Sequence, residues 1–281
     1  MIDRSDSHKP KIEHSEELSL PAIPKRKRNL YEPGISTDYR LSRSKIDLFM
    51  SCSRCFYLDR RLGISAPPPY PITLATAVDE LMKKEYDAYR IKNQPHPLME
   101  EAGVAAIPYS HPDLDAWRDS LRRGISYKVP NTPLVITGGI DDVWINNDDK
   151  LHIVDYKSTA KQGEVSIDAD WQIGYKRQLE IYQWLFRKNG FKVSDVAYFV
   201  YVNGDKNRPA FNDTMHFSST IIPYKGNASW VDATIEKILE TLSSPELPAS
   251  NPSCTHCAYR MHAASVEDWG AREAKTTPTQ S

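Results

Sequence analysis

The sequence predicts an α/β sandwich in which a central mixed β-sheet is flanked by helices. Three observations support this prediction. Apolar periodicity indicates elements in the order helix, helix, strand, strand, helix, strand, strand, helix. The turn-forming residues 146–149 separate two β-branched apolar runs and indicate a hairpin in the middle of the chain. The 281 residues are 40% hydrophobic, which is enough for the core of one ordinary or large domain.

The two ends of the chain are polar and differ in composition from the middle. We expect residues 1–40 to be a disordered or loosely attached tail, residues 41–263 the folded domain, and residues 264–281 a second disordered tail. No apolar run approaches the roughly 18 residues of a membrane span, and the first residues do not resemble a signal peptide. A cytoplasmic protein with no membrane partner is therefore expected. The formal net charge is −1, so no overall basic field argues for nucleic acid.

The first half of the domain is predicted to be helical. A short helix is expected from Ser42 or Ser44, either of which can cap it, to Met50. Apolar residues recur at helical spacing over 73–91, and a further helix is expected over 113–127.

The second half alternates strands with helices. Residues 134–145 and 151–157 are predicted to pair as the central hairpin. A polar loop follows. The sequence then predicts, in order, a helix over 171–188, strands over 194–203 and 214–222, and a helix over 227–242.

Three charged residues lie on or at the end of hairpin strands that should be buried: Asp141, Asp155 and Lys157. A buried carboxylate is costly unless it is paired or binds a metal. Two carboxylates beside one ammonium can hold a divalent ion and orient a water next to it. The alternative is that the acids face solvent and Lys157 is an ordinary strand-end lysine. Spacing alone leaves both interpretations open.

The four cysteines form two C-x-x-C pairs, Cys52 with Cys55 and Cys254 with Cys257. Disulfides are not expected in a reducing compartment. Four thiolates in two such pairs suit a zinc or iron–sulfur site. Because one pair lies near each end of the predicted domain, such a site would join the two ends. The alternative is four independent small hydrophobic side chains.

Several motifs together resemble the PD-(D/E)XK nuclease superfamily. Within it the chain resembles the RecB-like branch, which includes the nuclease domains of AddB-type helicase–nucleases and the CRISPR-associated iron–sulfur exonucleases. The motifs occur in order: G-x-I-D at 138–141, D-x-K at 155–157 and Q-x-x-x-Y at 178–182. The resemblance extends over residues 41–259. It implies a restriction-endonuclease-like sandwich.

By this resemblance, Asp141 and Asp155 bind the catalytic Mg²⁺ or Mn²⁺ ion, and the carbonyl of Tyr156 completes its shell. Lys157 orients or polarises the attacking water. Asp79 stands where the family usually has a histidine ligand, and Asp suits a hard cation equally well.

The remaining family positions concern the substrate and the cysteines. Gln178 and Tyr182 are expected to face the active site and to help place the substrate strand or Lys157. In the iron–sulfur members one cysteine precedes the nuclease core and three follow it, whereas here two precede and two follow. The resemblance favours a [4Fe–4S] cluster at the cysteines. Zinc is the alternative, because two C-x-x-C pairs suit a tetrahedral zinc ion equally well.

The function implied is a metal-dependent DNA nuclease, exonuclease-like, that hydrolyses phosphodiester bonds in repair, recombination or processing. Its expected partners are DNA, as single strands or duplex ends, and a helicase or another repair or recombination protein. One alternative is a catalytically inactive nucleic-acid-binding module, which the aspartate at position 79 motivates. The other is a structural subunit of a larger repair complex on the same fold.

Overall fold

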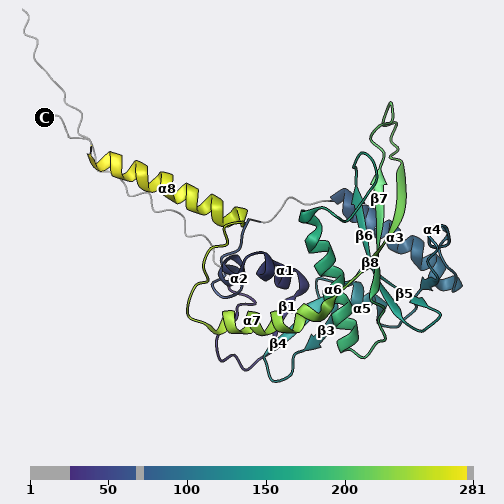
Figure 1. Ribbon diagram of the computed structural model, residues 1–281, viewed down its shortest axis with the longest axis horizontal. Coiled ribbons are helices and arrows are strands. Elements are labelled where there is room, and N and C mark those ends of the chain that lie inside the picture. Colours follow the sequence, from purple (N-terminus) through teal and green to yellow (C-terminus); the bar gives the residue numbers. More distant parts are fainter. Residues whose placement is uncertain (1–25, 68–72, 277–281) are drawn as a thin grey trace, which may run out of the picture.

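The computed structural model describes residues 26–67 and 73–276 (Figure 1). Residues 1–25 of the tail predicted over 1–40, and the last five residues of the tail predicted over 264–281, lie outside the described part. A five-stranded sheet in the order β2-β5-β6-β7-β8 forms the centre of the fold. Its strands are β2 (Ala106–Pro108), β5 (Asp142–Asn146), β6 (Leu151–Thr159), β7 (Val196–Gly204) and β8 (Phe217–Lys225). β6 and β7 are parallel and the other pairs are antiparallel, which confirms the predicted mixed sheet.

A second, three-stranded sheet lies beside the first, in the order β1-β4-β3. It contains β1 (Tyr39–Ser42), β3 (Ile125–Lys128) and β4 (Leu134–Gly138). The prediction of one strand over 134–145 was wrong, because β4 and β5 belong to different sheets. The chain breaks at Gly139, where an added Cβ would lie 2.4 Å from the Cβ of Ser120. This close approach of another segment requires glycine and turns the chain from one sheet into the other.

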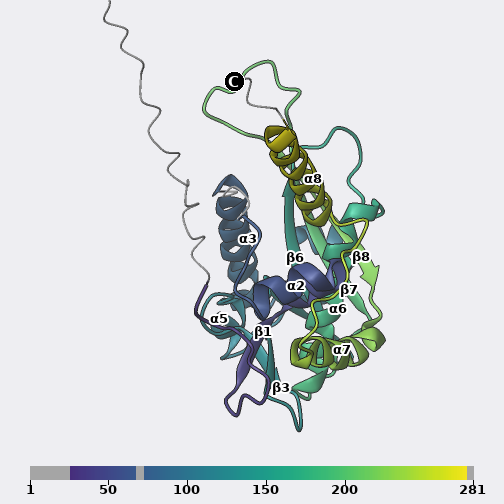
Figure 2. The same ribbon diagram turned by 90° about the vertical axis from the view of Figure 1, so that its left-hand side faces the viewer.

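Helices cover both faces of the central sheet. α1 (Arg43–Ser51), α6 (Ile173–Lys188) and α7 (Val231–Ser243) contribute to the larger core, which contains Ile153 and Phe199 of the sheet. α3 (Thr73–Lys92) and α4 (Pro97–Glu101) contribute to a smaller core on the opposite face, with Val154 and Val200. Figure 2 shows α3 on one side of β6 and α7 on the other. This layering confirms the predicted α/β sandwich.

The two cores determine which way each residue of β6 points. Ile153 belongs to the larger core and Val154 to the smaller one. Because side chains alternate along a strand, Asp155 and Lys157 point towards the α6 face and Tyr156 towards the α3 face. The face of the sheet that carries the charges of the D-x-K motif is therefore the one covered by α6.

The helix predicted over 113–127 ends early. α5 spans only Leu114–Arg118, and a loop connects it to β3. Gly124 has φ +69°, and a Cβ there would lie 2.5 Å from the carbonyl oxygen of Gly138. A helix cannot continue through this left-handed position. The helices α2 (Ser53–Arg60), which follows α1 directly, and α4 were not predicted from the sequence.

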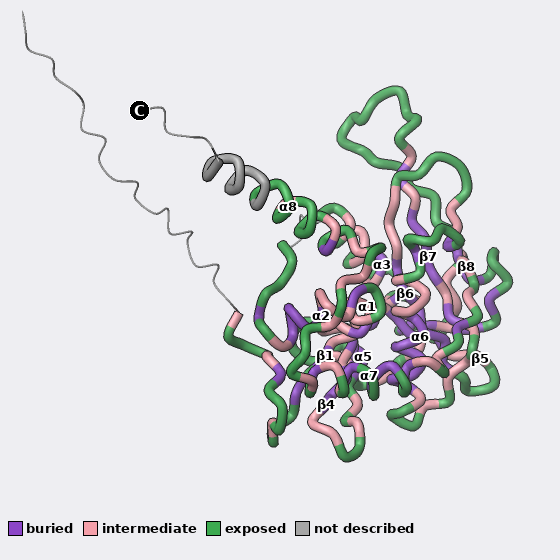
Figure 3. Tube along the Cα trace, turned by 60° about the vertical axis from the view of Figure 1, so that its left-hand side comes forward, coloured by how far each residue is buried: buried purple, intermediate pink, exposed green. Residues whose placement is uncertain are grey.

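Parts of both predicted tails lie in the described chain. Tyr31 is 3% exposed and belongs to the larger core. The segment before β1 therefore packs on the domain. α8 (Thr255–Thr276) continues through residues 264–276 and projects away from the domain (Figure 1). Figure 3 shows that most of the residues 255–267 of α8 are exposed, whereas the central strands are largely buried. No helix in the described part of the chain is both long and apolar enough to cross a membrane.

Candidate active site

Strand pairing places Asp141 beside Asp155. β5 runs antiparallel to β6 with Asp142 opposite Val154, so Asp141 lies at the level of Asp155. The backbone N–H of Tyr156 donates a 2.9 Å hydrogen bond to Oδ2 of Asp141. This bond turns the Asp141 carboxylate towards β6. Its other oxygen, Oδ1, makes no hydrogen bond to that strand.

Asp155 is a buried carboxylate with unused oxygens. Its side chain is 0% exposed and forms an ion pair with Nζ of Lys157. Apart from that ion pair, neither oxygen accepts a hydrogen bond from the described residues. Burial, together with the negative charge of Asp141, raises the pKa of Asp155 to about 7, although the charge of Lys157 opposes the shift. Buried carboxylate oxygens without donors are what a divalent cation would satisfy.

The side chain of Lys157 is held by three neighbours. Its Nζ pairs with Asp155, lies 3.4 Å from Oε1 of Gln178, and sits 4.5 Å from the ring centroid of Tyr175. Burial opposes its charge, but the carboxylates of Asp155 and Asp141 raise the pKa of Lys157 overall. The ammonium is therefore a fixed positive charge at neutral pH.

The Q-x-x-x-Y residues of α6 lie on the face that meets Lys157. Nε2 of Gln178 lies 3.4 Å from the hydroxyl of Tyr182, which is 3% exposed. Gly138 makes room for this ring, because a Cβ there would lie 2.5 Å from Cε1 of Tyr182. Burial raises the pKa of Tyr182, while a hydrogen bond from Arg43 opposes the shift. The first glycine of the G-x-I-D motif and the last residue of the Q-x-x-x-Y motif are thus packing partners.

Asp79 approaches the site from α3 but is already paired. Its Oδ2 lies 2.6 Å from Nζ of Lys83, and the same Nζ lies 3.6 Å from Oδ1 of Asp141. Burial raises the pKa of Asp79, and the charge of Asp141 adds to the shift. Asp79, Asp141 and Asp155 do not form a compact three-ligand group, since the only such group in the described chain consists of cysteines. Asp79 as a metal ligand, like the carbonyl of Tyr156, stays a prediction.

Two cationic features of the site were missed from the sequence. Lys83 lies one helical turn after Asp79, and this i, i+4 spacing was the only signal for it. The second is a cleft of about 700 Å³ that borders Gly138 and Tyr182. Four arginines from two segments line it: Arg40, Arg43, Arg122 and Arg123. Arg43 also acts electrostatically on Asp155, and the cleft borders Gly138 and Gly139 of the motif that ends in Asp141.

Asp142, next to the predicted ligand, has a different role. It is 0% exposed and forms ion pairs with Arg90 and Arg118. It also accepts a 2.8 Å hydrogen bond from the hydroxyl of Tyr156 and a 3.3 Å bond from Nε1 of Trp144. These contacts occupy both oxygens of the Asp142 carboxylate. Asp142 therefore stabilises the α3 face of the sheet and is not available to a metal.

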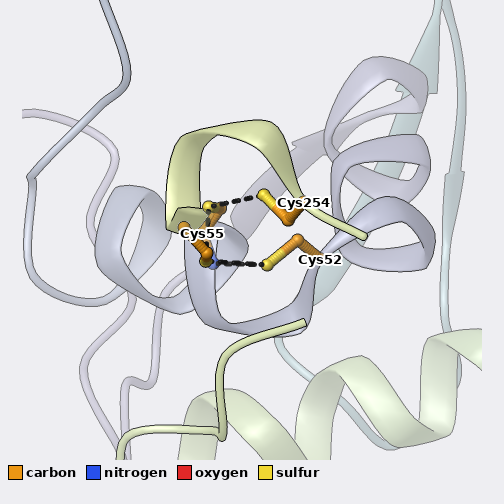
Figure 4. Close-up of side chains that lie close together, drawn as sticks. Cys52, Cys55 and Cys254 are labelled. Atoms are coloured by element: carbon orange, nitrogen blue, oxygen red, sulfur yellow. Dashed lines mark hydrogen bonds between the residues drawn. The ribbon is translucent and has the colours of Figure 1, made fainter. Parts of the chain in front are cut away.

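The fold brings the two cysteine pairs together (Figure 4). Cys52 and Cys55 lie at the start of α2, and Cys254 and Cys257 lie at the start of α8. All four Sγ atoms lie within 4.8 Å of one another, and all four cysteines are free of disulfides. The predicted clustering of the cysteines into one group that can hold a metal is confirmed.

Comparison with known proteins identifies the superfamily. The family model described as the PD-(D/E)XK nuclease superfamily matches residues 40–262. No curated protein matches the chain significantly. Among solved structures, the crystal structure of SSO0001 is similar with 12% identity and a TM-score of 0.29, covering 73% of this chain and 78% of that one. Since the family match covers most of the chain and both sheets, the protein belongs to the PD-(D/E)XK nuclease superfamily.

Proposed function

We propose that this protein is a metal-dependent deoxyribonuclease of the RecB-like branch that removes nucleotides from single strands or duplex ends. The observation that carries the proposal is Asp155, a fully buried carboxylate whose oxygens, apart from the ion pair with Lys157, accept no hydrogen bond from the described residues. It lies beside Asp141 and pairs with Lys157, whose side chain is 16% exposed. A purely structural carboxylate at such a position would have donors, as Asp142 does.

The residues present suit Mg²⁺ or Mn²⁺. Asp141 and Asp155 would hold the ion, with Asp79 and the carbonyl of Tyr156 as further ligands. When bound, such an ion lowers the pKa of a coordinated water and neutralises charge that develops on the phosphate. Lys157 supplies a second positive charge where the phosphate oxygens gain negative charge. Gln178 holds the Lys157 ammonium in place, and Asp155 keeps it protonated.

The basic cleft supports a nucleic-acid substrate. Arg40, Arg43, Arg122 and Arg123 line a space that adjoins the ring of Tyr182. Guanidinium groups bind phosphate oxygens through paired hydrogen bonds and suit a backbone that leads to the scissile bond. The family branch adds a cytoplasmic helicase or repair protein as the expected partner. It also favours a [4Fe–4S] cluster at the cysteines, where zinc is the alternative.

The test is a cleavage assay on end-labelled single- and double-stranded DNA with Mg²⁺, Mn²⁺ or EDTA. We expect release of short products from single strands or duplex ends with either metal and none with EDTA. A folded protein that cuts neither DNA nor RNA with either metal would overturn the proposal.

An inactive binding module is the second candidate, and Lys83 favours it. Its ammonium already contacts Asp79 and lies near Asp141, so the site has a built-in cation. Such a module would bind DNA equally well with EDTA and would not be affected by loss of Lys157. The cleavage assay and a binding assay in EDTA together separate the two functions.

Replacing Lys83 with methionine tests whether its ammonium competes with the metal. Without it, Asp79 and Asp141 lose the ammonium that lies between them, and Lys157 remains as the more distant positive charge. We expect the Mg²⁺ concentration for half-maximal cleavage to fall about threefold to tenfold, equivalent to an interaction of about 1 kcal/mol between partly exposed charges. Lys84→Met, on the exposed side of the same helix, is the control. An unchanged Mg²⁺ dependence would show that Lys83 plays no part in metal affinity.

Trp171 is predicted to stack on an unpaired base. Its side chain is 69% exposed, and its ring stands edge-on to Tyr175 at 5.6 Å. Tyr175 in turn contacts Lys157, so Trp171 lies at the rim of the site. Stacking on one base contributes about 1–3 kcal/mol. Trp171→Ala should therefore raise KM for single-stranded DNA about 5- to 100-fold with little change in kcat, and Trp171→Phe should restore most of the loss. Equal KM values for wild type and Trp171→Ala would refute base stacking.

A further inference from the structure

The spacing of the four thiols indicates the size of the metal centre. Sγ of Cys52 lies 3.6 Å from that of Cys257, and Sγ of Cys55 lies 3.6 Å from Cys254 and 3.7 Å from Cys257. Four sulfurs about 2.3 Å from one tetrahedral zinc ion lie about 3.8 Å from one another. The observed separations therefore correspond to ligands that share a single ion.

An iron–sulfur cluster requires a different arrangement. In a [4Fe–4S] cluster each cysteine binds a different iron, so the inorganic core stands between the thiolates. Here the sulfurs are nearly in van der Waals contact, and all four lie within 4.8 Å of one another. The space between them holds one ion and not a core of eight atoms. The cluster favoured by the family branch does not fit this site.

Each C-x-x-C pair is presented in the same way. Cys52 immediately precedes α2 and Cys55 lies in its first turn, while Cys254 immediately precedes α8 and Cys257 lies in its first turn. The backbone N–H of Cys55 points at Sγ of Cys52 at 3.5 Å. Two helix starts thus contribute two thiolates each, which completes a tetrahedron and leaves no open position for a substrate.

The segment that carries the second pair has almost no other attachment. From Ser243 to Glu267 only Cys257 is buried. The polar contacts of this segment with the α1–α2 region are few. Nδ2 of Asn251 donates to the carbonyl of Ser51 at 2.7 Å, Arg54 donates to the carbonyl of Pro248 at 3.2 Å, and the hydroxyl of Tyr57 donates to the carbonyl of Ser244 at 3.0 Å. Buried apolar side chains therefore contribute little to the attachment of α8 to the rest of the domain. Another interaction must supply that attachment.

We propose that the four cysteines bind one structural zinc ion instead of a [4Fe–4S] cluster, and that this ion attaches the start of α8 to α2. The inference is independent of the nuclease activity. Zinc thiolate bonds contribute folding free energy directly where the surrounding core is small. The zinc would thus fasten the C-terminal end of the domain next to the short α1–α2 unit.

The first test measures metal content in the full-length protein. The protein is produced in medium containing both iron and zinc, purified without oxygen, and assayed for metals and acid-labile sulfide. We expect one zinc per chain, no iron or sulfide, and no visible absorption. Anaerobic treatment with iron and sulfide should not generate a cluster. Four irons with sulfide would overturn the inference, as would a folded protein that takes up no zinc.

The second test uses variants and a structural readout. Cys254→Ser with Cys257→Ser should lose the zinc and expose residues 244–276 to protease, while the core up to residue 243 stays protected. Ser253→Ala, in the same loop, is the matched control and should keep both the zinc and the protection. Unaltered protease resistance of the double variant would refute the role of the ion in attaching α8. The metal content of the wild type decides the identity of the metal even if the variant does not fold.

Discussion

Replacing Lys157 with methionine is expected to lower kcat for DNA cleavage at least about a hundredfold, because removal of one fixed charge donor at a developing oxyanion typically costs about 10²–10³ in rate. Methionine keeps the unbranched shape of the side chain but loses the cation–π contact of the ammonium with the Tyr175 ring. What disappears is the positive charge next to Asp155. KM should change little, since the charge acts on the transition state more than on the bound substrate.

Single-turnover cleavage with saturating Mg²⁺ measures this effect directly. Lys161→Met is the matched control, because Lys161 follows the same strand but is exposed. The control should cleave like wild type. Circular dichroism shows whether both variants remain folded. Cleavage by folded Lys157→Met within threefold of wild type would remove Lys157 from the mechanism.

Replacing Asp155 with asparagine is expected to abolish cleavage and, without metal, to stabilise the protein at high pH. The neutral amide cannot act as a strong ligand for a hard cation. It also removes a buried charge, whose cost is visible in the pKa of about 7 for Asp155. Loss of activity and gain of stability from one substitution distinguish a ligand from a structural residue.

The pH dependence of stability has a definite sign. The unfolded carboxyl titrates near its ordinary pKa of about 3.9, whereas the folded one titrates at about 7. Between these values the folded state binds more protons than the unfolded state, so wild-type stability should fall as pH rises from about 4 to 7. The free energy of unfolding of Asp155→Asn should lack this fall. The two proteins should agree near pH 4 and differ most at pH 8.

Denaturant unfolding at pH 5 and pH 8, with and without Mn²⁺, checks this prediction. Mn²⁺ should stabilise wild type at pH 8 and have no effect on Asp155→Asn, because a ligand stabilises only the state that binds it. A variant less stable than wild type at pH 8 without metal would mean that the pair with Lys157 outweighs the cost of burying Asp155.

Local sequence patterns determined the elements that carry the site. The periodicity of 73–91 and 171–188 corresponds to α3 and α6, and the turn at 146–149 joins β5 to β6. The motif residues Asp155 and Lys157 lie on one strand, two residues apart. Strand alternation by itself therefore places these two side chains on the same face of the sheet.

Only the tertiary structure decided where the chain changes direction and which cations enter the site. The break between β4 and β5 depends on Ser120 approaching Gly139, and the path of the loop from α5 to β3 depends on Gly124 approaching the carbonyl oxygen of Gly138. Lys83 approaches Asp141 from α3, a helix that lies far earlier in the chain. Contacts between distant segments leave no periodic signal in the sequence.

The cysteine site likewise has features that the sequence determined and one that only the tertiary structure decided. Two C-x-x-C pairs determined the number and type of ligands, and their positions indicated that the ends of the domain meet. Whether one ion or a cluster lies between them depends on the distances between the Sγ atoms of Cys52, Cys55, Cys254 and Cys257. Those distances are set by how α2 and α8 approach each other, and sequence spacing within each pair is the same for both kinds of centre.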